Sequence, residues 1–244
     1  MGLWERCLDL IRRRGGSPSR GDCTLGLHSL QSDVSQMGSA QLDALISGAF
    51  APRLNALGFE QIRPRRWVRS SKLPIREIVQ VQALKGASYG PRWGFSLDFV
   101  PLFRKGHFRW KRTAKSADFD LCIDPEDELD SNGRYRFAYG LPGYPPPTIA
   151  AKAALTIEHA TRDFDRISSL RDVAALFEAR AVRRYGRFSP ENYISTHLAW
   201  GLTLLALQQG RAGEEHLALF CARFGPARDH PMLLKAVAEA QRLD

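Results

Sequence analysis

The chain has 244 residues, of which 44% are hydrophobic and 25% are charged, and its formal net charge is +9. This composition is that of an ordinary folded protein, so it excludes a collagen, a wholly disordered chain and a disulfide miniprotein. No apolar run approaches the roughly 18 residues that a membrane-spanning helix needs, which excludes a transmembrane helix as well.

The positive charge is concentrated in one part of the chain. Residues 37–117 contain 15 Lys and Arg against 4 Asp and Glu, whereas residues 118–147 contain 2 against 7. A nucleic-acid-binding protein needs its basic residues unopposed on one face, because its affinity comes from the counterions that they displace from phosphates. Since the acidic segment follows directly, the charge pattern alone does not establish nucleic-acid binding.

The cysteines and the first residues favour a cytoplasmic protein. The four cysteines show no C-x-x-C and no paired spacing, which is typical of a reducing compartment. They are Cys7, Cys23, Cys122 and Cys221. Glu5, Arg6 and Asp9 interrupt the apolar residues at the start of the chain. The start therefore does not match a secretory signal peptide.

Residues 15–38 are rich in Gly, Ser, Asp and Gln and show no hydrophobic periodicity. This predicts a flexible leader over residues 1–38. Met37 stands just before the first periodic segment and offers an alternative start codon, in which case residues 1–36 would be an annotation artefact.

A change of hydrophobic period divides the next part of the chain into one helix and several strands. From Ala40 to Leu57 apolar residues recur every three or four positions, which predicts an amphipathic helix that Gly58 can end. Five later segments alternate apolar with polar residues, which predicts half-buried antiparallel strands with one face on a core and one in water. These segments are residues 79–83, 93–99, 108–111, 119–123 and 135–139. Residues 39–147 are thus predicted to form an α+β domain, a helix on a four- to five-stranded antiparallel sheet.

One pair of strands can be placed in register. A hairpin of residues 107–112 and 118–123 would match charges on the wet face and apolar rings on the buried face, and a slip by one residue would ruin both. The opposed pairs are then Lys111–Asp118 and Arg109–Asp120 on the wet face, and Trp110–Phe119 and Phe108–Leu121 on the buried face.

Prolines between residues 142 and 147 predict a hinge into an all-helical region, residues 148–244. About five helices are expected there, packed against or beside the first domain, each marked by a capping residue or by helical spacing. Their predicted starts or ranges are Thr148, Ser169, Ser189-Pro190-Glu191, residues 212–223 and residues 231–242, with the third helix running to Gly210.

Four short motifs between residues 42 and 125 carry a resemblance. They are Leu57-Gly58-Phe59 at a helix end, the basic strand Arg66-Trp67-Val68, and the strands Val79-Gln80-Val81-Gln82 and Phe95-Ser96-Leu97-Asp98-Phe99. In these motifs this third of the chain resembles the bacterial domain-of-unknown-function family 4304. The resemblance implies a helix on an antiparallel sheet and brings no reaction and no catalytic residues. Some families of this kind are thought to be immunity or accessory proteins, which favours a binding role.

Two motifs that suggest chemistry have simpler explanations. Gly86-Ala87-Ser88-Tyr89-Gly90 matches G-x-S-x-G, but a nucleophile elbow needs a helix after the serine, and here Pro91 and a predicted strand follow. A glycine-rich connection between two strands explains the letters better. Acidic and amide residues from Glu128 to Gly133 match half of a calcium loop, but Tyr139 stands where a bidentate Glu is needed. A solvated acidic loop ending in an Asn132-Gly133 hairpin turn explains that pattern.

The six histidines show no H-E-x-x-H motif and no close pairing in sequence. His197 follows the helical spacing of apolar neighbours, so a core position is the expectation for it. No catalytic residue, metal ligand or cofactor is predicted from these patterns.

The best functional candidate is the basic stretch with aromatic residues among its arginines. Arginine beside exposed aromatic rings suits an acidic protein partner, and it also suits the phosphates and bases of a nucleic acid. The third explanation is that half of these charges are neutralised within the predicted hairpin and that the rest form a solvated rim. The predicted partner-binding residues are Arg63, Arg65, Arg66, Trp67, Arg69, Arg76, Arg104 and Lys105.

The sequence therefore favours a cytoplasmic, non-enzymatic binding protein whose basic sheet face engages an acidic protein partner. A nucleic-acid-associated protein is the first alternative, and an enzyme of unknown chemistry is the second. No membrane partner is expected, and the pattern does not indicate an oligomeric state.

Overall fold

The computed structural model describes residues 39–84, 88–110, 113–123, 139–140, 146–182 and 196–243. All of them belong to one compact unit, Asp33–Asp244. Several predictions lie wholly or largely outside the described residues: the leader over residues 1–38, the calcium-like loop before Tyr139, the strand over residues 135–139, and the helix start at Ser189.

Helix α2, Ser39–Ala56, forms where the apolar spacing predicts it. Its buried residues lie on one side, at the spacing of three and four that covers a core. They are Leu42, Ile46, Phe50 and Leu54. Gly58 adopts a φ of 82°, in the left-handed region that favours glycine, and the Phe59 N–H donates to the Leu54 carbonyl at 2.9 Å. The helix therefore ends as predicted and the chain turns directly into the first strand.

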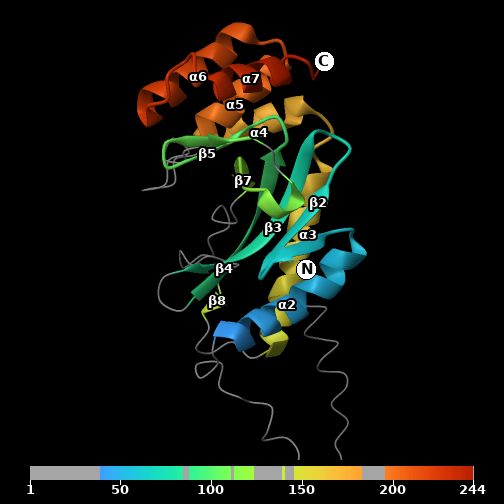
Figure 1. Ribbon diagram of the computed structural model, residues 1–244. Helices are drawn as coiled ribbons and strands as arrows, with labels where there is room; N and C mark the ends of the chain where they lie inside the picture. Colours follow the sequence, from blue (N-terminus) through green and yellow to red (C-terminus); the bar gives the residue numbers. More distant parts are fainter. Residues whose placement is uncertain are drawn as a thin grey trace, which may run out of the picture. The chain divides into compact units, whose positions relative to one another are not determined.

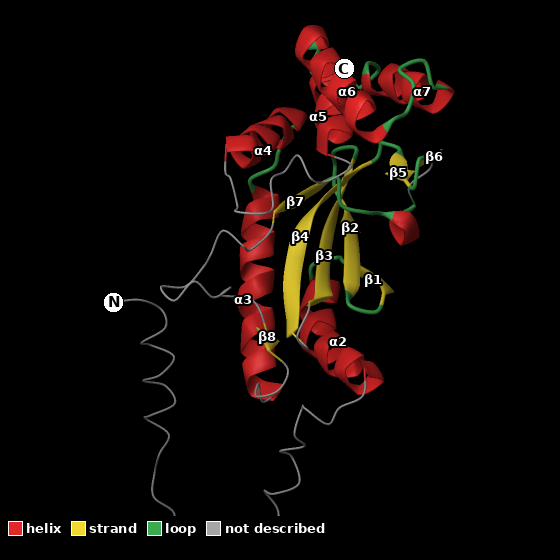
Figure 2. Ribbon diagram, turned by 90° about the vertical axis from the view of Figure 1, so that its left-hand side faces the viewer, coloured by secondary structure: helices red, strands yellow, loops and turns green. Residues whose placement is uncertain are grey.

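Five strands form one antiparallel sheet in the order β1-β2-β3-β4-β7 (Figures 1 and 2). A short strand, β8, pairs with the beginning of β4. The strands are β1 Glu60–Arg63, β2 Arg66–Ser70, β3 Ile75–Leu84, β4 Ser88–Leu97, β7 Leu121–Ile123 and β8 Tyr139–Gly140. The predicted class, α+β with an amphipathic helix on an antiparallel sheet and helices after it, is confirmed. Since Ser88 opens a strand that pairs with β3, no helix follows the G-x-S-x-G motif.

The inner face of the sheet packs against two helices, α2 and α3, the latter spanning Pro146–Asp165 (Figure 2). Alternate residues of the strands point to this face, as the period of two predicts. The Trp67 ring stacks on Phe50 of α2 with centroids 5.5 Å apart, and Phe95 meets Phe164 of α3 edge to face at 5.4 Å. The Trp93 indole N–H donates to Asp163 at 2.9 Å. These contacts join the sheet and both helices in one core.

Gly94 explains how the short strand β7 approaches β4. A Cβ atom at Gly94 would lie 2.1 Å from the Leu121 carbonyl oxygen and 2.9 Å from the Cys122 Cα. Both are backbone atoms of the neighbouring strand and cannot move aside without breaking the pairing. Glycine is thus required here by the close approach of two backbones.

The outer face of the sheet is not simply wet, which corrects the expectation of one face in water. Residues 113–119, here called the covering segment, fold over it and include the short 3-10 helix η2, Ala114–Ser116. Ala117 is fully buried against Val68 and Ile78, and Phe119 packs on the same small cluster. The outer face therefore carries a second apolar contact that the alternation of residues did not reveal.

The predicted hairpin of residues 107–112 with 118–123 is wrong. Strand β6, His107–Arg109, pairs with β5, Leu102–Arg104, through a two-residue turn in which Lys105 and Gly106 have φ of 52° and 79°. Such a turn matches the twist of two strands, and it brings Phe103 and Phe108 to 4.8 Å. Strand β6 therefore pairs with β5 and not with residues 118–123, because the loop between β5 and β6 is shorter and costs less entropy to close.

The other half of that predicted hairpin pairs elsewhere. Strand β7 adds to the edge of β4, where Leu121 lies opposite Phe95. Asp120 is held by backbone groups, since its N–H donates to the Phe95 carbonyl at 2.9 Å and its carboxylate accepts from the Leu97 N–H at 2.8 Å. Asp118 pairs with arginines of β2 and β5. Charge matching across one hairpin was therefore not what fixed the register.

The described residues after 145 are helical apart from their connections. Helix α3 begins at Pro146, two residues before the predicted cap at Thr148, because proline lacks an N–H and is tolerated in a first turn. The boundary predicted after residue 147 thus falls inside α3. The prediction that Gly210 ends the preceding helix is wrong, because Gly210 is the first residue of α6. The later helices are α4 Leu170–Val182, α5 Thr196–Ala206, α6 Gly210–Phe224 and α7 Pro231–Ala240.

Helices α5, α6 and α7 gather at the end of the sheet where β5 lies (Figures 1 and 2). Phe220 of α6 is fully buried and meets Phe103 of β5 at 5.1 Å. His230 caps α7 by accepting from the Met232 N–H, and its ring lies 4.8 Å from Phe108. The C-terminal helices α6 and α7 thus pack against the β5–β6 hairpin.

Candidate functional site

The structure separates the eight predicted partner-binding residues into three groups. In the first group, each arginine forms an ion pair with one carboxylate of this chain. These pairs are Arg65–Asp43, Arg69–Glu77 and Arg76–Asp98. Arg69 also donates to the Leu57 carbonyl and lies over the Phe59 ring at 4.6 Å. The three arginines therefore stabilise the fold and contribute little net charge to the surface.

The Arg69–Glu77 pair lies beneath the end of α2. Glu77 is a buried carboxylate, and burial raises its pKa while the hydrogen bond from Arg69 lowers it. The two residues are direct cross-strand neighbours of β2 and β3, so their side chains share one face. Such a pair is a structural contact of the inner face, and it presents no charge to a partner.

Trp67 forms the second group alone, and its prediction as a partner contact is wrong. The side chain is 0% exposed and lies between α2 and the sheet. It faces inward because it alternates with Arg66 and Val68 on β2. A residue without exposed surface cannot touch a partner, so Trp67 is a core residue.

The third group comes together in space. Arg63 of β1, Arg66 of β2 and Arg104 of β5 contact the covering segment, which adds Lys115, and Lys105 follows Arg104 at the β5–β6 turn. We call these five cations, together with the Asp118 carboxylate, the cationic site. Arg63 donates to the Lys115 carbonyl at 3.0 Å, and Arg66 donates to the Ala117 carbonyl at 2.9 Å. The covering segment therefore serves as the scaffold on which cations of three strands meet.

The covering segment is itself fixed by local hydrogen bonds. The Thr113 N–H donates to the Ser116 hydroxyl at 2.8 Å, and the Ser116 N–H donates to the Thr113 carbonyl at 2.9 Å. Burial of Ala117 then holds the segment on the sheet. Because its backbone is fixed, the carbonyls that orient Arg63 and Arg66 are fixed as well.

Asp118 is the carboxylate at the centre of the cationic site. Its Oδ1 lies 3.3 Å from Arg66 Nη2, and its Oδ2 lies 3.2 Å from Arg104 Nη2. Among the described residues, the ion pairs of the five cations involve this one carboxylate. The pKa of Arg66 reflects this excess of cations over carboxylates. Burial lowers its pKa most, Asp118 opposes that effect, and the positive charges of Arg63 and Arg92 lower the pKa further.

The five cations differ in exposure. The Arg104 side chain is 68% exposed, whereas that of Arg66 is 12% exposed. Arg63, Lys105 and Lys115 are exposed. The cationic site thus has one partly buried guanidinium, that of Arg66, and four exposed cations that can reach a bound anion.

Beside the site, two arginines cover one aromatic ring. The guanidinium carbons of Arg66 and Arg92 lie 5.6 and 5.0 Å from the centroid of the Phe119 ring. Arg92 also donates to Gln82 at 2.9 Å and approaches the Cys122 sulfur at 3.3 Å. Cation–π contacts of this kind hold the guanidinium groups in place and keep the ring from solvent.

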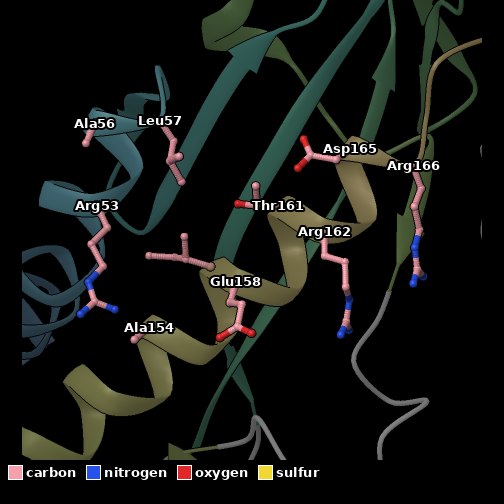
Figure 3. Close-up of a pocket in the computed structure, with 10 residues that line it drawn as sticks. Arg53, Ala56, Leu57, Ala154, Glu158, Thr161, Arg162, Asp165 and Arg166 are labelled. Carbon is pink, nitrogen blue, oxygen red and sulfur yellow. The ribbon is translucent and has the colours of Figure 1, made fainter. Parts of the chain in front are cut away.

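A hollow lies between α2 and α3, with a volume of about 770 Å³. Figure 3 shows that Arg53 and Ala56 come from α2, that Leu57 directly follows this helix, and that Glu158, Thr161 and Asp165 come from successive turns of α3. Its charged lining also includes Arg162 and Arg166. Since three cations alternate with two carboxylates there, the lining selects no single ligand charge.

The sequence analysis missed a pair of histidines. His197 of α5 and His216 of α6 approach with their Nδ1 atoms 3.0 Å apart, and the His216 ring stacks on Trp200 with centroids at 4.0 Å. They are 19 positions apart, so only the antiparallel pairing of two consecutive helices brings them together. Among the described residues no group of three His, Cys, Asp or Glu side chains could hold a metal ion.

The sequence analysis also missed Lys115 and the central position of Asp118. Both were assigned to the hairpin that the structure does not contain. Arg66 and Asp118 are 52 positions apart, and no periodicity predicts that contact. Only the folding of the covering segment onto the sheet could have revealed it.

Comparison with known proteins gives no match: no family model, no curated protein and no solved structure is significantly similar to this chain. None of the described helices combines the length and the apolar composition required to cross a membrane.

Proposed function

We propose that this protein is a non-catalytic binding protein whose cationic site engages the acidic surface of a protein partner. One observation carries the proposal: β1, β2, the β5–β6 hairpin and the covering segment contribute five cations, and among the described residues their ion pairs involve one carboxylate, that of Asp118. Exposed cations in such excess attract an acidic partner and accelerate its association. Arg65, Trp67, Arg69 and Arg76 are not part of the proposed surface.

An acidic protein fits the site better than a nucleic acid does. Single-stranded nucleic acid needs exposed aromatic rings for base stacking, but Trp67 is buried and Phe119 lies under Arg66 and Arg92. A duplex needs a row of cations that follows its phosphates, whereas this site is a compact cluster around a carboxylate. Both arguments favour carboxylates presented by a folded or extended polypeptide.

The proposal keeps two further expectations from the sequence. The scattered cysteines favour a cytoplasmic protein, and Cys122 and Cys221 are free thiols. The resemblance of residues 42–125 to family 4304 stays a prediction, and with it the role as an immunity or accessory protein. An enzyme of unknown chemistry is the alternative that a turnover assay would have to demonstrate.

The first prediction concerns removal of the exposed cations of the site. We expect that replacing all four by alanine weakens binding of a fluorescein-labelled oligo-glutamate peptide at least about tenfold, because each contributes to attraction of the anion. The variant combines Arg63→Ala, Arg104→Ala, Lys105→Ala and Lys115→Ala. Fluorescence anisotropy at fixed ionic strength measures the Kd, and thermal unfolding checks the fold.

The matched control removes the same charge elsewhere. It combines Arg171→Ala, Arg211→Ala, Arg228→Ala and Arg242→Ala, four exposed positions on or beside the C-terminal helices. This control should bind the peptide nearly as well as the wild type. Equal losses in both variants would mean that net charge alone attracts the peptide, and the proposal would be abandoned. Tighter binding of random-sequence DNA than of the peptide would favour the nucleic-acid alternative.

A further inference from the structure

Asp118 stands where an external anion would be expected to bind. Its two carboxylate oxygens each approach one guanidinium, from a partly buried arginine of β2 and from an exposed arginine of β5. Both contacts are single and longer than 3 Å, whereas an optimal arginine–carboxylate pair forms two parallel hydrogen bonds of roughly 2.7–2.9 Å. The guanidinium groups are therefore not saturated by this carboxylate.

We infer that Asp118 is an internal competitor for the acidic partner: a side-chain carboxylate of the partner takes the position between Arg66 and Arg104 that the Asp118 carboxylate now occupies. The inference rests on the proposed function and adds the chemistry of the central contact. It also assigns Asp118 a role in setting the affinity, since the site must release its own carboxylate before it accepts another.

The different surroundings of the two arginines allow this exchange. Arg104 lies at the β5–β6 turn with most of its side chain in solvent, so it can move from Asp118 to a partner without disturbing the core. Arg66 keeps its bonds to the Ala117 carbonyl and to Gln80, which hold the guanidinium in place while its Nη2 edge changes partner. Arg66 thus stays in place during the exchange, whereas Arg104 moves from Asp118 to the partner.

Asp118 is also tethered in a way that separates its charge from its structural role. Its Oδ1 accepts a hydrogen bond from the Phe119 N–H at 3.0 Å, which holds the bend before β7. Asparagine has the same shape and keeps an oxygen that can accept this bond, while it removes the negative charge. Asp118→Asn therefore tests the charge with little disturbance of the fold.

The experiment compares binding of the oligo-glutamate peptide by the wild type and by Asp118→Asn. We expect the variant to bind about three- to tenfold more tightly, because a carboxylate that repels and competes with the peptide is gone. The control is Asp98→Asn, which removes a carboxylate from another arginine pair, Arg76–Asp98. Arg76 lies on β3, four residues before the residue that is opposite Arg66. This control changes the net charge equally and should leave the Kd nearly unchanged.

A double variant shows whether the gain comes from the proposed position. Combining Asp118→Asn with Arg104→Gln should remove the gain, because the partner carboxylate then lacks its second guanidinium. If the wild type binds and Asp118→Asn binds no more tightly, this inference is overturned and the proposed function stands. An equal gain in Asp98→Asn overturns it in the same way. If neither the wild type nor Asp118→Asn binds the peptide, both proposals fall.

Discussion

At the scale of single residues, the position of the nearest carboxylate decides what each arginine does. Arg69 lies directly opposite Glu77 on the neighbouring strand, so the two neutralise each other within the fold. Arg63 finds a backbone carbonyl and keeps its charge available to a partner. A partner can use only the second kind of arginine, which is why a count of basic residues overstates the binding surface.

The histidine pair of α5 and α6 makes a prediction at the same scale. Burial lowers the pKa of His216 most, and the nearby His197 lowers it further, to about 4, while Glu215 has an opposing effect. The unfolded chain binds this proton at the ordinary pKa of 6.5, so between pH 6.5 and 4 it holds more protons than the folded protein. Stability must therefore be lost as the pH falls through that window.

We expect the free energy of unfolding of the wild type to fall by about 1–2 kcal/mol between pH 6.5 and 4 through this group, since solvent screens a half-buried ring. Urea unfolding at several pH values measures it. In His216→Gln this part of the pH dependence should disappear. His107→Gln, at an exposed position of β6, is the control and should follow the wild type. A pH profile that His216→Gln leaves unchanged would contradict the assignment.

At the scale of elements, two glycines set the packing of α5 against α6. A Cβ atom at Gly213 would lie 2.7 Å from Leu205 Cγ and 2.9 Å from the Gly201 carbonyl oxygen. A Cβ atom at Gly201 would likewise lie 2.9 Å from the Gly213 carbonyl oxygen. The two helix backbones therefore touch where these glycines meet, and this contact holds His197 near His216.

We expect Gly213→Ala to lower the free energy of unfolding by about 1–3 kcal/mol, because the added methyl group forces the helices apart. Gly48→Ala in α2 is the matched control, since no heavy atom lies within 4 Å of its Cβ position. It should raise the free energy of unfolding by up to about 1 kcal/mol, as alanine is the better helix former. Chemical denaturation measures both variants, and stabilisation by Gly213→Ala would refute the close packing.

The elements also show what could be predicted from the sequence. The period of two correctly places Val79, Trp93 and Phe95 on the inner face, because strand alternation depends only on neighbours in the chain. The Arg69–Glu77 pair could have been foreseen once β2 and β3 were in register. Asp118 could not, because its position depends on the covering segment returning to a strand about fifty positions earlier. The error at β6 arose from matching charges before considering the nearest turn.

At the scale of the whole molecule, the sheet and the C-terminal helices share one hydrophobic core. Phe164 joins α3 to Phe59 and Phe95, while Phe220 joins α6 to the β5–β6 hairpin. The cationic site takes Arg104 and Lys105 from that same hairpin. The helices therefore bear on function indirectly, by fixing the hairpin from which two of the five cations project.

We expect Phe220→Ala to lower the free energy of unfolding by about 3–5 kcal/mol, because it leaves a cavity between α6 and the β5–β6 hairpin. If the core unfolds as one cooperative unit, amide hydrogen exchange should accelerate in β3 and β4 as much as in α5 and α6. Leu219→Ala is the control, since Leu219 is the preceding residue and is 52% exposed. Its effect should stay within about 0.5–1 kcal/mol. Faster exchange in α6 and α7 alone would show instead that the helices unfold separately, and the hairpin would then keep its cations in place without them.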